Sequence, residues 1–373
     1  MVLACLATAT TSLAAIMVLR CFAGALGLVD HPSERKHHVG SVPSVGGLAI
    51  FIGLIVGAFI WGQFQLFGQI VLATSFVLVL LGVMDDRHDL SVRMRLAVQT
   101  VLILIVIAST GVYIDSLGRL FDYEVTLGWF GIPFTVVAVI GLLNAFNMMD
   151  GIDGLAGSVA LVSIAAIMLF AGSTALRGPM ALITLLAFAA IPYLAANLGF
   201  LGRKVFMGDA GSMVLGYLLA WSLIRLSQYP GTHLSPVDVL WCVALPVLDT
   251  LAVMYRRLCQ RKSPFKPDRG HIHHILMAIG LGPRATLVAL VALAASMAFL
   301  GSVTSSLGLG SGTNLAAFCI FAVIYTVTVT RMWLRQQARH AAHVLKLVAA
   351  NDDPVVPPVA IRRSKKSAVA AEE

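Results

Sequence analysis

The sequence contains few charged residues. Asp, Glu, Lys and Arg together make up 12% of its 373 positions, about half of the fraction that is usual in soluble proteins. Hydrophobic residues make up 58%, and the mean hydropathy is +0.89. A soluble domain of this length would need a more polar surface, so the composition predicts a protein that is embedded in a lipid bilayer.

Cysteine is also scarce, and its spacing excludes two kinds of site. The chain has 5 cysteines, and they are scattered without the spacing of a zinc site or of a disulfide framework.

The first apolar stretch, from about Leu3 to Leu28, lacks a basic leader and an Ala-x-Ala cleavage site. We therefore expect a retained membrane helix there rather than a signal peptide.

Basic residues outnumber acidic ones and give a net charge of +8, but the distribution of charge excludes a nucleic-acid partner. The Lys and Arg residues occupy short segments between apolar runs and the C-terminal tail, as the positive-inside rule requires. They are not interleaved with aromatic residues on a polar face, which is the pattern typical of nucleic-acid binding.

The apolar runs predict an all-α, polytopic integral membrane protein. A spanning helix needs about 20 mostly apolar residues, and the sequence offers about 11 such transmembrane helices. Basic connections alternate with weakly charged ones, which places the N-terminus in the periplasm and the C-terminus in the cytoplasm. Residues 1–335 are expected to form the membrane domain, and residues 336–373 a basic, disordered cytoplasmic tail. The expected helices begin near residues 3, 45, 68, 96, 129, 155, 179, 213, 237, 285 and 313.

Carboxylates stand at the ends of several apolar runs. Because an ionised carboxylate near lipid is costly, each of them is a candidate for a functional site. The expected topology places all of them on the cytoplasmic side, where a set of carboxylates would attract a divalent cation and an anion for it to hold. The pattern therefore indicates phosphoryl chemistry at a membrane face. These residues are Asp85, Asp86, Asp150, Asp153 and Asp209.

The segment NAFNMMDGIDGLAG is the most specific of these. Asn144, Asn147, Asp150 and Asp153 follow one another at intervals of three, so on a helix they would form one polar stripe. The structural alternative is that the segment is only a glycine-rich break in a helix, but such a break would need fewer polar residues than these four. For Asp209, which lies between two glycines, an N-cap of the next helix and a metal ligand both remain open.

The pair Asp85–Asp86 has two interpretations, and so has Arg95, which follows it at the start of the next apolar run. Adjacent carboxylates repel, so the pair is stable only near a cation or with a shared proton. Metal coordination and deprotonation of an incoming phosphate both fit it, and a solvated helix end is the structural alternative. Arg95 could hold a lipid phosphate or anchor the chain at the membrane surface. Asp249, inside an expected span, should face a cavity or a partner.

The longest cytoplasmic connection, residues 255–284, is rich in Arg, Lys and His. Its segment DRGHIHH contains Arg269, His271, His273 and His274. Such closely spaced histidines can bind zinc, but the loop lacks an obvious fourth ligand. Arg offers paired donors to phosphate oxygens, so the loop fits a pyrophosphate or a sugar better.

Together these motifs resemble one known family. PSVGG, MDD, NMMDGIDGLAG, FMGDAGS and KSPFKPDRGHIHH are similar to motifs of the polyprenyl-phosphate N-acetylhexosamine-1-phosphate transferases, over about residues 30–284. The last motif looks like that of the bacterial WecA-type branch, whose substrates are UDP-N-acetylglucosamine and undecaprenyl phosphate. The peptidoglycan branch instead carries three consecutive histidines followed by an acid, which this loop lacks.

The resemblance implies transfer of N-acetylglucosamine 1-phosphate from UDP-N-acetylglucosamine to undecaprenyl phosphate, with Mg²⁺ or Mn²⁺ as cofactor. The site would face the cytoplasm at a bacterial inner membrane, and the product would start O-antigen or a related surface polysaccharide. Asp209 and Asn147 would hold the metal. The expected catalytic residues are Asp85, Asp86, Asp150 and Asp153, and the expected substrate-binding residues are Arg95, Asn144, Arg269, His271, His273 and His274.

Several alternatives stay open on sequence alone. The donor could be another UDP-N-acetylhexosamine, such as a 6-deoxy sugar. The reaction could be a single displacement or could pass through a covalent aspartyl intermediate, and the chain could be a monomer or a homodimer. A secondary transporter for an anionic solute would instead place its acidic residues near the middle of the spans.

Overall fold

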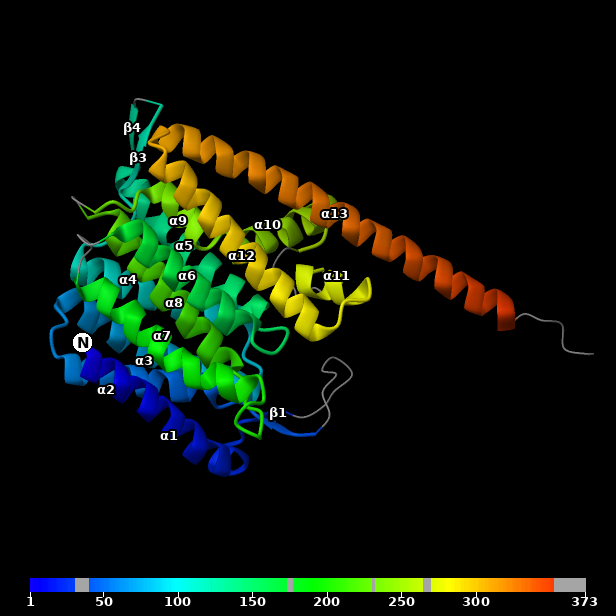
Figure 1. Cartoon of the computed structure of the whole chain (residues 1–373), viewed down its shortest axis with the longest axis horizontal. Helices are drawn as coiled ribbons and strands as arrows, with labels where there is room; N and C mark the ends of the chain where they lie inside the picture. The colour runs from blue at the N-terminus through cyan, green and yellow to red at the C-terminus, as the bar shows by residue number, and fades with distance from the viewer. Residues whose placement is uncertain (31–39, 122, 173–176, 230–231, 264–269, 352–373) are drawn as a thin grey trace, which may run out of the picture.

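The apolar runs of the sequence form α-helices in the computed structural model of the chain (Figure 1). The structure describes residues 1–30, 40–121, 123–172, 177–229, 232–263 and 270–351. Within these ranges the remaining regular structure is two short antiparallel strand pairs and one 3-10 turn. The predicted all-α class is therefore confirmed.

The helices follow one another along the chain with short connections. A 3-10 turn, η1 (Gly128–Phe130), directly precedes the fifth helix. The α-helices are α1 (Val2–Leu26), α2 (Gly46–Trp61), α3 (Leu66–His88), α4 (Val92–Thr110), α5 (Gly131–Met149), α6 (Leu155–Ala171), α7 (Arg177–Asn197), α8 (Gly208–Ser227), α9 (Pro236–Cys242), α10 (Ala244–Cys259), α11 (Ile272–Ala278), α12 (Pro283–Ser306) and α13 (Gly310–Asn351).

Eight of the described helices are long and apolar enough to cross a membrane, and the pair α9–α10, bent by 83°, would raise the number to 9. Pro246 accounts for this bend, because it cannot donate a hydrogen bond to the carbonyl of Cys242. Helices α2 and α6 have 16 and 17 residues, fewer than the about 20 of a typical span. The structure therefore supports a polytopic membrane protein. The count of 11 and the orientation of the termini stay predictions.

Helix α8 lies at the centre of the bundle and packs against α2, α3, α5, α6 and α7. Glycines on its neighbours allow this close approach. A Cβ atom at Gly82 of α3 would lie 2.3 Å from Cα of Ala210, and one at Gly47 of α2 would lie 2.1 Å from N of Gly211. Gly47 also donates its N–H to the carbonyl of Met207 across 2.8 Å. The PSVGG motif thus fixes the N-terminus of α8.

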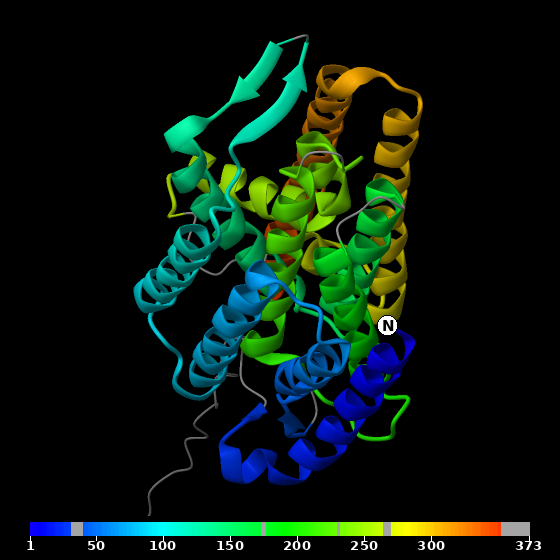
Figure 2. The ribbon, with the colours of Figure 1, turned by 90° about the vertical axis from the view of Figure 1, so that its left-hand side faces the viewer.

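The two strand pairs lie outside the helical bundle. β1 (Val29–Asp30) pairs with β2 (Val42–Pro43), and β3 (Ser116–Leu120) pairs with β4 (Tyr123–Thr126). The β3–β4 hairpin projects beyond the helices beside the start of α13 (Figures 1 and 2). Gln228, just after α8, accepts hydrogen bonds from the N–H groups of Asp115 and Ser116 at 3.0 Å each, which attaches the hairpin to the end of α8.

The last helix is longer than the sequence predicts. α13 continues to Asn351 and extends past the rest of the bundle (Figure 1). The helix thus runs through the first part of the segment 336–373 that is predicted to form the tail, because the apolar helix propagates into the Arg-, Gln- and Ala-rich residues that follow it. The division at residue 335 stays a prediction. Residues 352–373 lie outside the described residues, so the disorder predicted there stays a prediction.

Candidate active site

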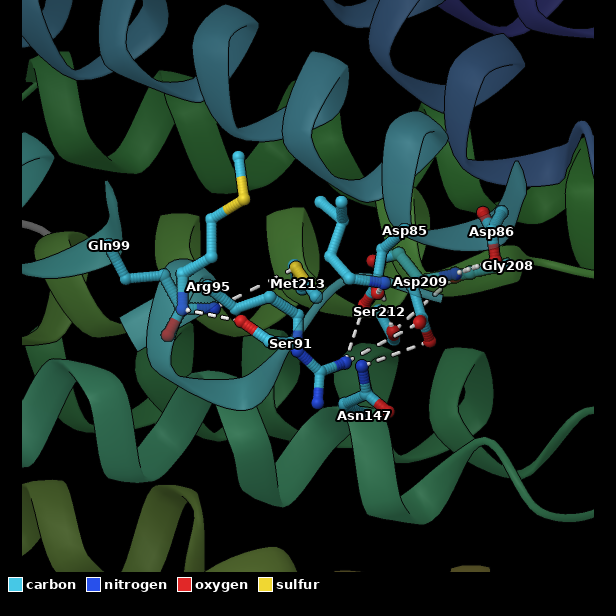
Figure 3. Close-up of polar contacts among 12 residues, drawn as sticks. Asp85, Asp86, Ser91, Arg95, Gln99, Asn147, Gly208, Asp209, Ser212 and Met213 are labelled. Atoms are coloured by element: carbon cyan, nitrogen blue, oxygen red, sulfur yellow. Dashed lines mark hydrogen bonds and ion pairs between the residues drawn. The ribbon is translucent and has the colours of Figure 1, made fainter. Parts of the chain in front are cut away.

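Three helices bring acidic and amide side chains together at one end of the bundle. Asp85 and Asp86 lie in the last turn of α3, Asn147 lies in the last turn of α5, and Asp209 lies in the first turn of α8. Because α8 packs against both α3 and α5, these side chains meet although they are far apart in the sequence. Figure 3 shows Asp85, Asn147 and Asp209 pointing toward one another, with Arg95 of α4 beside them and Asp86 beside Gly208.

Asp85 is buried and tied to basic and backbone donors. Its Oδ2 forms an ion pair with the guanidinium of Arg95, and its Oδ1 accepts a hydrogen bond from the N–H of Leu90 at 2.9 Å. The same guanidinium nitrogen lies 3.7 Å from Oδ2 of Asp209. Arg95 therefore connects the α3 carboxylate to the α8 carboxylate, and its place is set by the buried partner.

Asp209 is fixed by contacts on two sides. Its Oδ1 accepts a hydrogen bond from Nδ2 of Asn147 at 3.1 Å, and its backbone N–H donates to Oδ1 of Asp86 at 2.9 Å. The N-cap position of α8 belongs to Met207, so the N-cap alternative for Asp209 is wrong. Asp86 instead supplies the carboxylate at this helix N-terminus, where negative charge is favourable. The carboxylate of Asp209 remains about one-third exposed.

Asp150 and Asp153 lie in the turn between α5 and α6, beside this cluster. Burial, and after it the negative charges of Asp209, Asp86 and Asp153, raise the pKa of Asp150 well above its usual range. Asp153 forms an ion pair with the ammonium group of Lys204. Asp150 therefore differs from an ordinary surface carboxylate in its tendency to keep a proton.

Asn144 does not join the cluster through a hydrogen bond. Its Nδ2 donates to the carbonyl of Ile140 in its own helix at 2.8 Å. It lies one turn further from the helix end than Asn147, as the predicted stripe requires, but its amide serves α5 itself. Its role in substrate binding stays a prediction.

The histidines lie on the short helix α11 and its N-terminus. Nδ1 of His271 lies 2.7 Å from Oδ2 of Asp249, and Oδ1 of Asp249 accepts from the N–H of Ile272 at 2.9 Å. Asp249 is fully buried on α10, so the partner expected for it is His271. Tyr325 of α13 adds a longer contact, 3.4 Å from its hydroxyl to Oδ1 of Asp249.

His273 connects this helix to the turn that carries Asp150. A Cβ atom at Gly151 would lie 2.2 Å from Nε2 of His273, so the imidazole packs directly on that backbone. Burial, together with the neighbouring His274, lowers the pKa of His273 to about 3. The ring is therefore neutral at physiological pH. The ring centroid of His273 lies 6.0 Å from that of His271 and 4.2 Å from that of His274. Arg269 lies outside the described residues.

Sequence patterns did not reveal three partners in this region. Lys204 pairs with Asp153 across the site. Asn197, which is buried at the end of α7, accepts from the N–H of Gly154 and donates to the carbonyl of Val205 at 2.9 Å. It therefore joins the α5–α6 turn to the segment before α8. Tyr325 lies on the last helix. The one signal in the sequence for any of these partners is the basic pair Arg203–Lys204 before FMGDAGS, which places positive charge near the carboxylates.

The donor atoms of the cluster fit Mg²⁺ bound together with a phosphate. Among the described residues, no group of three or more His, Cys, Asp or Glu side chains could enclose a metal ion. Mg²⁺ prefers oxygen ligands and is usually held by one or two carboxylates together with waters and substrate phosphates. The partly exposed carboxylate of Asp209 and the adjacent amide of Asn147 match this requirement.

Comparisons with known proteins agree with the motifs. The family model of glycosyl transferase family 4 matches residues 69–227. A Yersinia pestis protein named undecaprenyl-phosphate alpha-N-acetylglucosaminyl 1-phosphate transferase is 40% identical over 330 residues, which cover 86% of this chain and 89% of that protein. A protein with the same name from Escherichia coli (strain K12) is 39% identical, and the match covers 83% of this chain and 85% of that protein. Another from Haemophilus influenzae is 35% identical, and the match covers 89% of this chain and 96% of that protein. The chain therefore belongs to glycosyl transferase family 4.

Proposed function

We propose that this protein transfers N-acetylglucosamine 1-phosphate from UDP-N-acetylglucosamine to undecaprenyl phosphate, at the cytoplasmic face of a bacterial inner membrane. The products are undecaprenyl-pyrophosphate-N-acetylglucosamine and UMP, and the lipid product starts O-antigen or a related surface polysaccharide. The names of the relatives support the two substrates. The site geometry supports the reaction class.

One observation carries this proposal: Arg95, Asn147 and Asp209 converge at the ends of three membrane helices. Oδ2 of Asp209 lies 3.7 Å from the guanidinium of Arg95, and its Oδ1 lies 3.1 Å from the amide of Asn147. Carboxylate, amide and guanidinium groups at one place can hold a cation and the phosphates around it. A transporter would instead place its ion sites near mid-span, whereas these carboxylates lie in the terminal turns of α3 and α8.

In the proposed reaction, an oxygen of the lipid phosphate forms a bond to the phosphorus that bears the sugar. The bond from that phosphorus to the bridging oxygen breaks, and UMP leaves with that oxygen. The charge that develops on the phosphate oxygens requires fixed cationic groups. Arg95 supplies one, because its ion pair with the buried Asp85 orients the guanidinium toward Asp209.

Asp209 and Asn147 would hold Mg²⁺, which would neutralise the pyrophosphate of the donor. Asp86 keeps Asp209 in place by accepting its backbone N–H. We assign Asp150 the role of proton acceptor for a lipid phosphate that arrives as a monoanion. A carboxylate with a raised pKa holds a transferred proton more readily than an ordinary one, and burial and neighbouring carboxylates raise the pKa of Asp150.

The remaining residues of the site would bind the donor. The Asp153–Lys204 pair places an exposed ammonium group beside the α5–α6 turn, within the reach of a pyrophosphate. His271 is oriented by Asp249, and with His273, His274 and Arg269 it would contact the sugar pyrophosphate. His273 is neutral and so contributes by packing and hydrogen bonding rather than by charge.

The test is release of UMP by the purified protein in detergent. UDP-N-acetylglucosamine is supplied with and without undecaprenyl phosphate, and with and without Mg²⁺. The proposal requires UMP release that depends on both the lipid and the metal. Competition with a 6-deoxy UDP-N-acetylhexosamine identifies the preferred donor. Solute counterflow in vesicles without UMP release would favour the transporter instead.

A further inference from the structure

A cavity lies at the end of the bundle that is opposite to the carboxylate cluster. Its volume is about 320 Å³, and it is bounded by the α2–α3 connection, the start of α7 and the last turn of α8. Arg225, which lines it, comes sixteen residues after Asp209 on α8, or about 24 Å along the helix axis. This is most of the thickness of a membrane core, which is about 30 Å, so the cavity faces the other leaflet.

The charged groups of this cavity are all cationic. Arg177 and Arg225 both line it, and none of its lining residues is acidic. In the described parts of the chain, neither guanidinium forms an ion pair or a hydrogen bond. Two guanidinium groups on the wall of one cavity can together bind the oxygens of a phosphate. The cavity therefore has the charge of a binding site for an anion.

The geometry of Arg225 supports the same ligand. Its side chain is half-buried, and its Cζ lies 5.6 Å from the centre of the Phe67 ring and 5.2 Å from that of Tyr229. These cation–π contacts hold the guanidinium in place without neutralising it. Helices α3 and α7 begin at this cavity, and helices α2 and α8 end there. The opposite ends of these helix dipoles offset one another, so the positive charge of the cavity comes from the two arginines.

The rest of the lining combines amide groups with aromatic surface. Gln63 and Gln65 offer neutral hydrogen-bond donors, and Trp61 and Phe64 form an apolar wall. The aromatic rings of Trp61 and Phe64 pack edge to face with centroids 4.6 Å apart. Such a wall suits the glycerol and upper acyl region of a lipid, and aromatic residues are common at this depth of a membrane. A soluble phosphate would make no use of it.

We propose that this cavity binds the phosphate head group of an anionic membrane lipid in the leaflet opposite to the carboxylate cluster. Arg177 and Arg225 bind the phosphate oxygens, and the aromatic wall contacts the glycerol and acyl region. This site is separate from the carboxylate cluster and does not depend on the transfer reaction.

The test is a titration of the delipidated full-length protein, with bound lipid counted by native mass spectrometry. The probes are dioctanoyl phosphatidic acid, dioctanoyl phosphatidylcholine and inorganic phosphate. We expect phosphatidic acid to bind at least about 10-fold more tightly than phosphatidylcholine, and the double variant R177Q/R225Q to lose at least about 10-fold in affinity, as expected for loss of two charge-assisted contacts. UMP release by the double variant should be unchanged.

Arg119→Gln is the matched control, because Arg119 is exposed on β3 at the same end of the molecule and does not line the cavity. Arg225→Lys keeps the charge and should retain most of the binding. If the double variant does not fold, Arg177→Gln alone, at an exposed position, still has to weaken binding.

Three results would overturn the proposal. One is equal affinity for the two lipids. Another is binding that survives undiminished in R177Q/R225Q, because the two arginines would then not hold the phosphate. The third is displacement of the lipid by an equal concentration of inorganic phosphate, which would make the ligand a soluble anion.

Discussion

The guanidinium of Arg95 lies between two carboxylates, ion-paired with Asp85 and 3.7 Å from Oδ2 of Asp209. The Asp85 side chain is 4% exposed and the Asp209 side chain 34% exposed. One carboxylate is thus a buried anchor, and the other is open to a ligand. In this arrangement Arg95 has a structural partner and a separate functional partner, which mutations can separate.

Removing Arg95 should destabilise the protein and abolish activity. Arg95→Gln leaves the buried Asp85 carboxylate without its cation, which typically costs about 3–5 kcal/mol. The double variant D85N/R95Q removes both charges and should recover much of the stability, but it should not recover transfer because the phosphate loses its guanidinium. Thermal unfolding and UMP release measure the two effects. Recovery of activity together with stability would show that Arg95 has only a structural role.

Gly151 should tolerate no side chain, because its backbone touches His273. A Cβ atom there would lie 2.2 Å from Nε2 of His273, so Gly151→Ala must displace either the α5–α6 turn or helix α11. We expect a loss of at least about 10-fold in kcat/KM, the scale of an added barrier of about 1.4 kcal/mol.

Gly141→Ala on α5 is the matched control, because no atom lies within 4 Å of a Cβ at that position. It should keep full activity and gain slightly in stability, since Ala favours a helix over Gly. Equal activity of the two variants would contradict the contact between His273 and the turn.

Asp150→Asn should stabilise the metal-free protein at neutral pH while it lowers activity. Because the pKa of Asp150 is raised in the folded state, its favourable contribution is complete below the pKa of the unfolded chain. It is lost as the pH rises through the folded-state pKa. The variant should therefore match the wild type at acidic pH and exceed it in unfolding temperature at neutral pH in EDTA.

The same substitution removes the proposed proton acceptor, so kcat should fall by about 100-fold or more. The acidic limb of the wild-type pH–rate profile should lie well above the pH range in which ordinary carboxylates titrate. A variant with wild-type kcat would exclude Asp150 as the acceptor.

Asp249→Asn should impair the donor site without unfolding the bundle. The carboxylate can only accept from Nδ1 of His271, whereas an amide can donate to it and reverse the tautomer. Partners that orient a functional imidazole typically contribute about 10- to 100-fold, and we expect a loss in that range. Tyr325→Phe is the milder companion change, because its contact with Asp249 is 3.4 Å long. Similar losses in both variants would indicate a packing defect instead.

Sequence patterns predicted the parts of this site that depend on local composition. Asp85, Asp86, Asn147 and Asp209 stand at the ends of apolar runs, and the structure brings them together at one end of the bundle. Their position at the ends of the runs follows from the cost of placing a charge in lipid, and that cost applies to each run separately.

Contacts between distant segments could not be predicted in this way. Asp249 pairs with His271 and contacts Tyr325, and Asp153 pairs with Lys204, but no local period links these residues. The short helices α2 and α6 also depend on packing. Their sequences are as apolar as those of full spans, so hydropathy alone cannot distinguish them.

The most direct test of the proposed chemistry follows each phosphorus of the donor. UDP-N-acetylglucosamine labelled with ³²P on the sugar-bearing phosphate is incubated with the purified protein, undecaprenyl phosphate and Mg²⁺, and the lipid is then extracted. A parallel reaction carries the label on the phosphate next to uridine. We predict that the first label enters the lipid phase and that the second remains in water as UMP. Both the labelling of the lipid and the release of UMP should be lost in Asp209→Asn. Sugar in the lipid phase while both labels stay in water as UDP would contradict transfer of a sugar phosphate.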